Sequence, residues 1–231
     1  MISLTERDRE FLDHLRRYRG STPSIVTPTI CNGSEAVSKK LISRLRDYVA
    51  SDPIGTKTVY YRLKPAGTKL LGAPEEISRP LGPQALPKVL GIVDFCCAGP
   101  KKRTRYTRQE FIEDFPELVK ELLGKDYHTD FFIDADGEQA RFGQIVVDLG
   151  GDYQKLLSKC RVRLREYLDV GHMRDIVADG LFTFAIVVAE EEKAASIRTA
   201  LLHRPLQATV IVEVSSELQK YPLVSGGEYG A

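Results

Sequence analysis

Residues 34–49 constrain the fold of this chain most strongly, because they combine a helix start with two different faces. Ser34 is a favoured N-cap residue, and Asn32-Gly33 before it supports a tight turn. At about 100° per residue, one side of the expected helix is apolar and the other is basic and small. The apolar side consists of Val37, Leu41, Leu45 and Tyr48, with Ile42 and Val49 beside them, and the outward side consists of Ala36, Lys39, Lys40, Ser43 and Arg46. The sequence therefore predicts a helix that is buried along one side and carries cations on the other.

The segments around this helix predict a small domain of helices and one hairpin. Thr5 and Asp8 resemble a capping box, which predicts a helix start near residue 5. A short linking helix is expected near residues 24–30. Downstream, proline and glycine predict a turn over residues 52–57, and alternation of apolar and polar residues predicts a strand over 58–63. The expected order is helix, linking helix, helix and hairpin.

Two stretches in this part of the chain resemble known families. Residues 61–71, YRLKPAGTKLL, resemble the closing strand and turn of bacterial winged-helix regulators, in which an aromatic residue, an alternate leucine and a later glycine recur. Residues 4–12, LTERDREFL, resemble the N-terminus of the plasmid replication-relaxation family and related mobile-element proteins. Together the resemblances cover about the first third of the chain. They imply a helix-turn-helix with a wing, whose 34–49 helix would enter the major groove of double-stranded DNA.

The expected DNA contacts follow from the outward face and from the wing. The residues expected to face the groove are Lys39, Lys40, Ser43 and Arg46. Lys57 and Thr58 would contact the DNA backbone from the wing. Ser34 would donate a hydrogen bond from its backbone amide to a phosphate. An isolated helix with external lysines is more often only a solvated helix. The neighbouring elements favour the DNA-binding interpretation.

Charge is distributed unevenly along the chain. Residues 1–72 hold 13 Lys and Arg against 7 Asp and Glu, a net charge of +6, whereas the remainder holds 20 against 25, a net charge of −5. A basic module joined to an acidic one fits a phosphate-binding domain attached to a domain that need not bind DNA. The basic run 101–108 is an exception, and it is either a second phosphate contact or a solvated loop before a helix.

Length and composition set the outer limits. The 231 residues, 42% of them hydrophobic, are enough for two modest cores. No apolar stretch has membrane-spanning length, and a charged helix is expected within five residues of the start, so we expect a cytoplasmic protein without a signal peptide or membrane partner. The four cysteines lack paired CxxC spacing. We therefore expect reduced, structural cysteines, no metal site and no cofactor.

The rest of the chain predicts a linker and an α/β domain. Clustered glycine and proline predict a boundary between Leu71 and Pro87. The expected domains are a winged helix over 1–72, a linker and helix over 73–106, an α/β domain over 107–220 and a flexible tail over 221–231. The expected elements are helices over 89–98 and 107–123, a hairpin of strands 129–133 and 141–148, a helix over 153–168, a strand over 182–189, a helix over 193–203 and a strand over 209–214. Hairpin, helix, strand, helix and strand is the pattern of an α/β sheet.

This order resembles the restriction-endonuclease-like fold of PD-(D/E)XK nucleases, and also the C-terminal domain of the replication-relaxation family. Such nucleases hold a divalent metal ion with an Asp on one strand and an acid and a Lys on the next. Asp130 matches the first position, but the next strand lacks the lysine, and Val146 stands where the acid would be. If the domain were a nuclease using Mg²⁺, its catalytic residues would be Asp130, Asp148, Lys155 and Lys159. We expect instead a nuclease-like domain without nuclease chemistry that forms a dimer.

These observations lead to three functional hypotheses. The first is a sequence-specific regulator of transcription from a bacterial or mobile-element operon, which binds double-stranded DNA as a homodimer. The second is a metal-dependent DNA endonuclease or nickase in mobile-element replication or transfer. The third is a non-enzymatic replication initiator or accessory protein. The first is favoured because the nuclease motif is incomplete.

Overall fold

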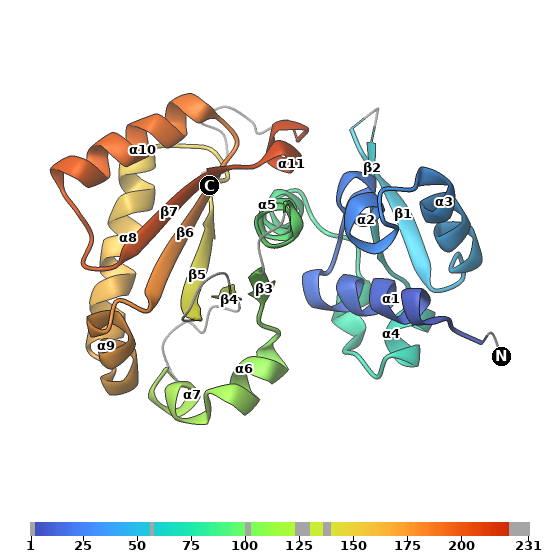
Figure 1. The fold of residues 1–231 in the computed structure, drawn as a ribbon, viewed down its shortest axis with the longest axis horizontal. Helices are drawn as coiled ribbons and strands as arrows, with labels where there is room; N and C mark the ends of the chain where they lie inside the picture. Colours follow the sequence, from blue (N-terminus) through green and yellow to red (C-terminus); the bar gives the residue numbers. More distant parts are fainter. Residues whose placement is uncertain (1–2, 56–57, 100–102, 123–129, 136–139, 222–231) are drawn as a thin grey trace. The chain divides into compact units, whose positions relative to one another are not determined.

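The computed structural model describes residues 3–55, 58–99, 103–122, 130–135 and 140–221. The protein is a mixed structure of helices and two β-sheets, and the chain divides into two compact units, Met1–Gly99 and Pro100–Ala231 (Figure 1). Within the described residues, no helix has both the length and the apolar character that a membrane span requires. Each unit is described by itself below.

The first unit consists of helices and one hairpin, in the order expected. Its elements are α1 (Glu6–Tyr18), α2 (Pro23–Ile30), α3 (Glu35–Arg44), β1 (Val49–Ile54), β2 (Thr58–Leu63), α4 (Pro65–Leu70), the 3-10 helix η1 (Glu75–Ser78) and α5 (Ala85–Cys97). Strands β1 and β2 are antiparallel, with Val49 opposite Leu63. Ser21, between α1 and α2, forms an isolated antiparallel bridge with Tyr61 of β2. The connection from α1 to α2 therefore adds one short pairing to the hairpin.

Local sequence signals explain where α1 begins. The Thr5 hydroxyl accepts a hydrogen bond from the Asp8 amide, and the Asp8 carboxylate accepts one from the Thr5 amide at 2.8 Å. This reciprocal arrangement is the capping box that the sequence predicts. Buried Phe11, Leu12 and Leu15 then attach α1 to the core of the first unit.

The helix expected over residues 34–49 is shorter than predicted. α3 ends at Arg44, residues 45–48 form a turn, and Val49 begins β1. The amides of Tyr48 and Val49 both donate to the carbonyl of Leu45, which closes the turn. Leu45 and Val49 are still buried, because the turn and the strand direct them into the same core as Leu41.

The hairpin is longer than predicted, and its first strand contains residues that the sequence assigns to a turn. Asp52 and Pro53 lie within β1, opposite Tyr60 and Val59. Because β1 lies at the edge of a two-stranded sheet, a proline can occupy it without losing a pairing to another strand.

The boundary expected between Leu71 and Pro87 also differs from the division of the structure, which follows Gly99. The cause is α5, which packs against α1 and α2 and therefore belongs to the first unit. Its start at Ala85 also precedes the expected start at residue 89.

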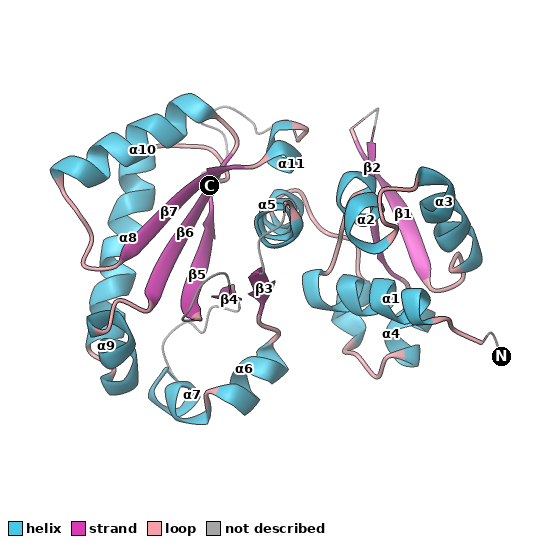
Figure 2. Ribbon diagram, in the orientation of Figure 1, coloured by secondary structure: helices cyan, strands magenta, loops and turns pink. Residues whose placement is uncertain are grey.

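The second unit contains one five-stranded sheet and six helices among its described residues. Its elements are β3 (Arg103–Arg105), α6 (Arg108–Asp114), α7 (Pro116–Leu122), β4 (Phe131–Asp134), β5 (Arg141–Val147), α8 (Tyr153–Leu168), α9 (Gly171–Ala178), β6 (Phe182–Val188), α10 (Glu191–His203), β7 (Thr209–Val214) and α11 (Ser216–Gln219). The sheet order is β3-β4-β5-β6-β7. β4 is antiparallel to both of its neighbours, β3 and β5, whereas β5, β6 and β7 are parallel to one another (Figure 2). The expected order of hairpin, helix, strand, helix and strand is confirmed.

Alternation along the strands gives this sheet two distinct faces. The face that carries Phe142, Phe182 and Ile186 packs against α8, α9 and α10, and we call it the helical face. The opposite face carries residues of the other parity, including Phe132 and Thr183. Both faces are buried in the middle of the sheet.

The helix expected over residues 107–123 is two helices, α6 and α7, separated at Phe115. The residue before a proline is disfavoured in helical geometry, which explains the break before Pro116. Helix α9 has no counterpart among the predicted elements. Residues 222–231 of the expected tail lie outside the described residues.

Candidate nucleic-acid interface

The outward side of α3 is exposed as the sequence predicts. Ala36, Lys39, Lys40 and Ser43 are all exposed, and they follow one another at helical spacing along one side of the helix. The Lys39 side chain is 83% exposed, and its Nζ lies 3.9 Å from a carboxylate oxygen of Glu35. At this distance and exposure the ion pair is weak, so Lys39 can leave Glu35 and bind another anion. The α3 face, as we call these four residues, is thus a small, solvated and basic surface.

The amide of Ser34 is not available for a phosphate. It donates to the Cys31 carbonyl at 3.0 Å, whereas the Ser34 hydroxyl accepts from the Val37 amide at 3.4 Å. Ser34 is therefore the N-cap of α3, as expected, but its expected role as an amide donor to DNA is wrong.

Arg44 at the end of α3 is part of the fold. Its Nε donates to Asp8 Oδ1 at 3.0 Å, its Nη2 contacts the same oxygen, and Nη2 also donates to the Thr5 hydroxyl. Burial raises the pKa of Asp8, but the hydrogen bonds from the Thr5 amide and from Arg44 outweigh it, so this pKa lies below its usual value. The side chain of Asp8 is completely buried, so Arg44 connects the end of α3 to the start of α1 through a desolvated ion pair. Sequence reasoning missed this role, since nothing local connects residues 36 positions apart.

Arg46 is not on the helix. It is exposed in the turn between α3 and β1, and its carbonyl accepts a hydrogen bond from Lys64 Nζ at 2.6 Å. The prediction that Arg46 continues the α3 face is therefore wrong in its helical geometry, because the helix ends two residues earlier. Arg46 remains a solvated cation next to the α3 C-terminus.

The hairpin is braced at its base. Arg62 donates to Asp52 across the two strands at 2.5 Å and to the carbonyl of Ser78 at 2.5 Å. At the other end, Gly55 adopts a positive φ of 59°, which glycine tolerates without strain. Lys57, expected to contact DNA from this end, lies outside the described residues, and Thr58 is partly exposed at the start of β2.

The two nuclease carboxylates have separate partners. Asp130, one residue before Phe131 of the helical face, belongs to the opposite face by alternation, and its carboxylate accepts from Arg105 Nη2 at 3.2 Å. Asp148 follows β5, and its carboxylate lies 2.6 Å from Lys193 Nζ of α10. Because α10 covers the helical face, the structure does not bring the two carboxylates together.

The two candidate lysines lie elsewhere. Lys155 and Lys159 are exposed on α8, on the side away from its buried stripe of Leu156, Leu157 and Cys160. The cation beside Asp148 is instead Lys193, which also donates to the carbonyl of Gly151 at 2.7 Å. In the described parts of the chain, no group of three or more His, Cys, Asp and Glu side chains could hold a metal ion.

The basic run over residues 101–108 is partly buried in ion pairs. Arg103 makes a bidentate contact with Glu213, both distances being 2.9 Å, and a third contact with Asp134 at 3.1 Å. Burial lowers the pKa of Arg103, but these carboxylates more than offset the effect and raise it above the usual value. Arg103 therefore connects β3 and β7, the two edge strands of the sheet, and is not a surface contact for phosphate.

Comparison of the chain with protein-family models, with curated proteins and with solved structures finds no match.

Proposed function

We propose that the first unit is a winged helix that binds double-stranded DNA, with α3 in the major groove and the β1–β2 hairpin as the wing. The order of three helices followed by an antiparallel hairpin supports this proposal, as does the bridge between Ser21 and Tyr61. The observation that carries it is the α3 face, where Lys39, Lys40 and Ser43 are solvated while the opposite side of the helix is buried.

The chemistry of the α3 face gives its residues different roles. Lys39 and Lys40 carry compact charges suited to phosphate oxygens, and such contacts fix position without reading sequence. The Ser43 hydroxyl both donates and accepts, so it can meet a base edge in the groove. Arg46 supplies a further cation beyond the helix end. Lys57 and Thr58 would contact the backbone from the wing.

We further propose that the protein acts as a sequence-specific regulator of a bacterial or mobile-element operon, with a nuclease-like second unit that does not cut DNA. The separation of Asp130 and Asp148 onto different faces, each with its own cation, supports a non-enzymatic second unit. A replication initiator would use the same α3 face and remains the alternative role.

The test is binding and cleavage in one experiment. The purified protein is mixed with its own upstream DNA and with random duplex, with and without Mg²⁺ or Mn²⁺, and resolved on native and denaturing gels. We expect a discrete shift on upstream DNA with both strands intact, and we expect Ser43→Ala to reduce the preference for upstream over random DNA. Metal-dependent nicks that disappear in Asp130→Ala would establish the nuclease instead, and equal weak binding to both duplexes would contradict sequence-specific recognition.

A further inference from the structure

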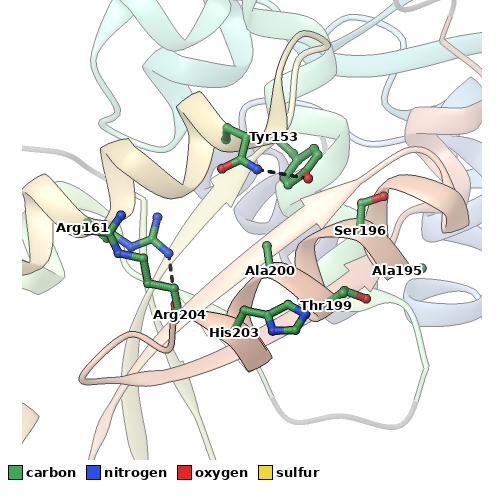
Figure 3. A pocket seen from close by; sticks show the side chains of 9 residues that line it. Tyr153, Arg161, Ala195, Ser196, Thr199, Ala200, His203 and Arg204 are labelled. Atoms are coloured by element: carbon green, nitrogen blue, oxygen red, sulfur yellow. Dashed lines mark hydrogen bonds between the residues drawn. The ribbon is translucent and has the colours of Figure 1, made fainter.

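A groove lies between α8 and α10 of the second unit (Figure 3). It has a volume of about 560 Å³, and small α10 side chains, including Ala195, Thr199 and Ala200, form part of its wall. Tyr153 and Arg161 line it from α8, and Arg161 donates to the carbonyl of Arg204 at 3.0 Å. The groove is therefore lined by small residues in α10 and is basic at the end where α10 terminates.

Leu202 is the most exposed large apolar side chain among the described residues, at 84%. Its helical position places it on the outward side of α10 with Ala195 and Thr199, whereas Ala194 and Ile197 are buried toward the sheet. One exposed leucine alone needs no explanation. Here it lies on the same side of α10 as Ala195 and Thr199, two small residues of the groove wall.

The two ends of α10 carry opposite charge. Glu190, Glu191 and Glu192 stand at its start, and Arg204 stands at its end. If a second α10 packed antiparallel about the midpoint near residue 197, the acidic end of each helix would meet the basic end of the other. In that register Glu190 is opposite Arg204, and Ala195 is opposite Thr199, so small residues stand where the helices approach most closely. A two-fold axis generates this self-complementary contact from a single surface.

We propose that the α8–α10 groove joins two copies of this chain, with α10 antiparallel to α10 of the partner subunit and each Leu202 seated in the other's groove. In this register Leu202 of the partner subunit is opposite Glu192, one turn before Ala195, and it enters the groove at the end where Tyr153 lies. The inference deepens the proposed function, since it names the second copy that a two-half-site operator requires. Because the surface belongs to the second unit, it can be tested without DNA.

The first test is the mass of the full chain in solution, by sedimentation velocity or light scattering over a hundredfold range of concentration. The wild-type chain is expected at twice its mass of 25.9 kDa, and Leu202→Glu at the single-chain mass. Leu70→Glu is the matched control, since Leu70 is an exposed leucine of the first unit, at 45%, and its replacement should leave the dimer intact. A wild-type monomer throughout, or a Leu202→Glu dimer as tight as the wild type, would overturn the proposal.

The second test uses charge exchange, which leaves the apolar contact unchanged. Glu190→Arg and Arg204→Glu should each weaken self-association at least tenfold, because every homodimer then opposes like charges. An equal mixture of the two variants should restore the dimer, since both pairs are complementary in the heterodimer. If the mixture associates no better than either variant alone, the antiparallel register is wrong.

Failure of this proposal can be distinguished from failure of DNA binding. Leu202→Glu keeps the α3 face, so on a duplex that contains a single half-site the monomer should bind with the same dependence on salt as the wild type. A wild-type protein that dimerises through α10 but does not bind duplex DNA would support this interface and contradict the proposed function.

Discussion

The ion pair between Arg44 and Asp8 gives the sharpest prediction about the scaffold of the α3 face. Arg44→Met retains most of the apolar stem and removes the guanidinium. The completely buried Asp8 carboxylate then keeps the hydrogen bonds that the Thr5 amide and the Thr5 hydroxyl each donate to it at 2.8 Å, but it has lost its cation. We expect α1 and α3 to lose stability while the overall fold is kept.

The magnitude follows from the burial of the two partners. Removing one partner of a fully buried pair costs about 3–5 kcal/mol. The Arg44 side chain is 43% exposed, so solvent screening reduces the expected loss to about 2 kcal/mol. Hydrogen exchange of the α1 and α3 amides in the full chain measures this loss as a change in the free energy of local opening. A loss of about 2 kcal/mol corresponds to roughly 30-fold faster exchange.

Two comparisons can refute this reasoning. Arg46→Met makes the same chemical change two residues later at an exposed position, and we expect it to alter the opening free energy by less than about 0.5 kcal/mol. The pKa of Asp8 is lower in the folded protein than in the unfolded chain. The ionised Asp8 therefore stabilises the folded state above the unfolded pKa, and this stabilisation is lost as pH falls through the folded pKa. The difference between wild type and Arg44→Met should therefore shrink below about pH 4. Equal effects of the two substitutions, or a difference that does not change with pH, would show that the ion pair is not the cause.

Three further predictions concern the two cores. In Gly143→Ala, the new Cβ would lie 2.5 Å from a carbonyl oxygen of β6 and closer still to a phenylalanine ring of β4. We therefore expect the free energy of unfolding, measured by chemical denaturation, to fall by about 2 kcal/mol. Gly82→Ala is the control, because open space surrounds Gly82 and the substitution should be neutral. Arg103→Met should lower the free energy of unfolding by about 3–5 kcal/mol in the same assay, because it removes the cation that Asp134 and Glu213 share. Arg198→Met removes an exposed ion pair and should lower it by less than about 1 kcal/mol. Burial lowers the pKa of His14 to about 4, so the protein should lose at most about 3 kcal/mol of stability as pH falls from about 6.5 to 4, and His14→Gln should remove that part of the pH dependence. A pH profile of unfolding midpoints that is identical in wild type and His14→Gln would contradict this assignment.

The elements read most accurately from the sequence are those fixed by local interactions. The capping box at Thr5 sets the start of α1, and the apolar stripe of α8 predicts its limits at Tyr153 and Leu168 correctly. The end of α3 was missed for a physical reason. Leu45 and Val49 continue the helical apolar pattern, but they reach the core through a turn and a strand, and periodicity does not distinguish these routes.

The errors in the candidate sites come from contacts between distant residues. The sequence places Arg103 in a basic run that is either a phosphate contact or a solvated loop, yet its guanidinium pairs with Glu213, which lies 110 residues later. The sequence offered Lys155 and Lys159 of the helix after β5 as the lysines of a nuclease site with Asp130 and Asp148, whereas the fold places Lys193 of another helix beside Asp148. Local pattern gives the charge of a segment but not which cations remain exposed after folding.

The salt dependence of DNA binding by the α3 face tests the central claim most directly. Fluorescence anisotropy on a labelled duplex from about 50 to 200 mM salt compares wild type with the double variant Lys39→Ala/Lys40→Ala. The matched control is Lys155→Ala/Lys159→Ala, which removes two exposed lysines from α8. Each lost phosphate contact reduces the magnitude of the slope of log affinity against log salt by about 0.9, so we predict a decrease of about 2 per bound subunit for the α3 variant and no change for the α8 variant. An α3 variant with wild-type affinity and slope, or equal losses in both double variants, would contradict DNA binding through α3.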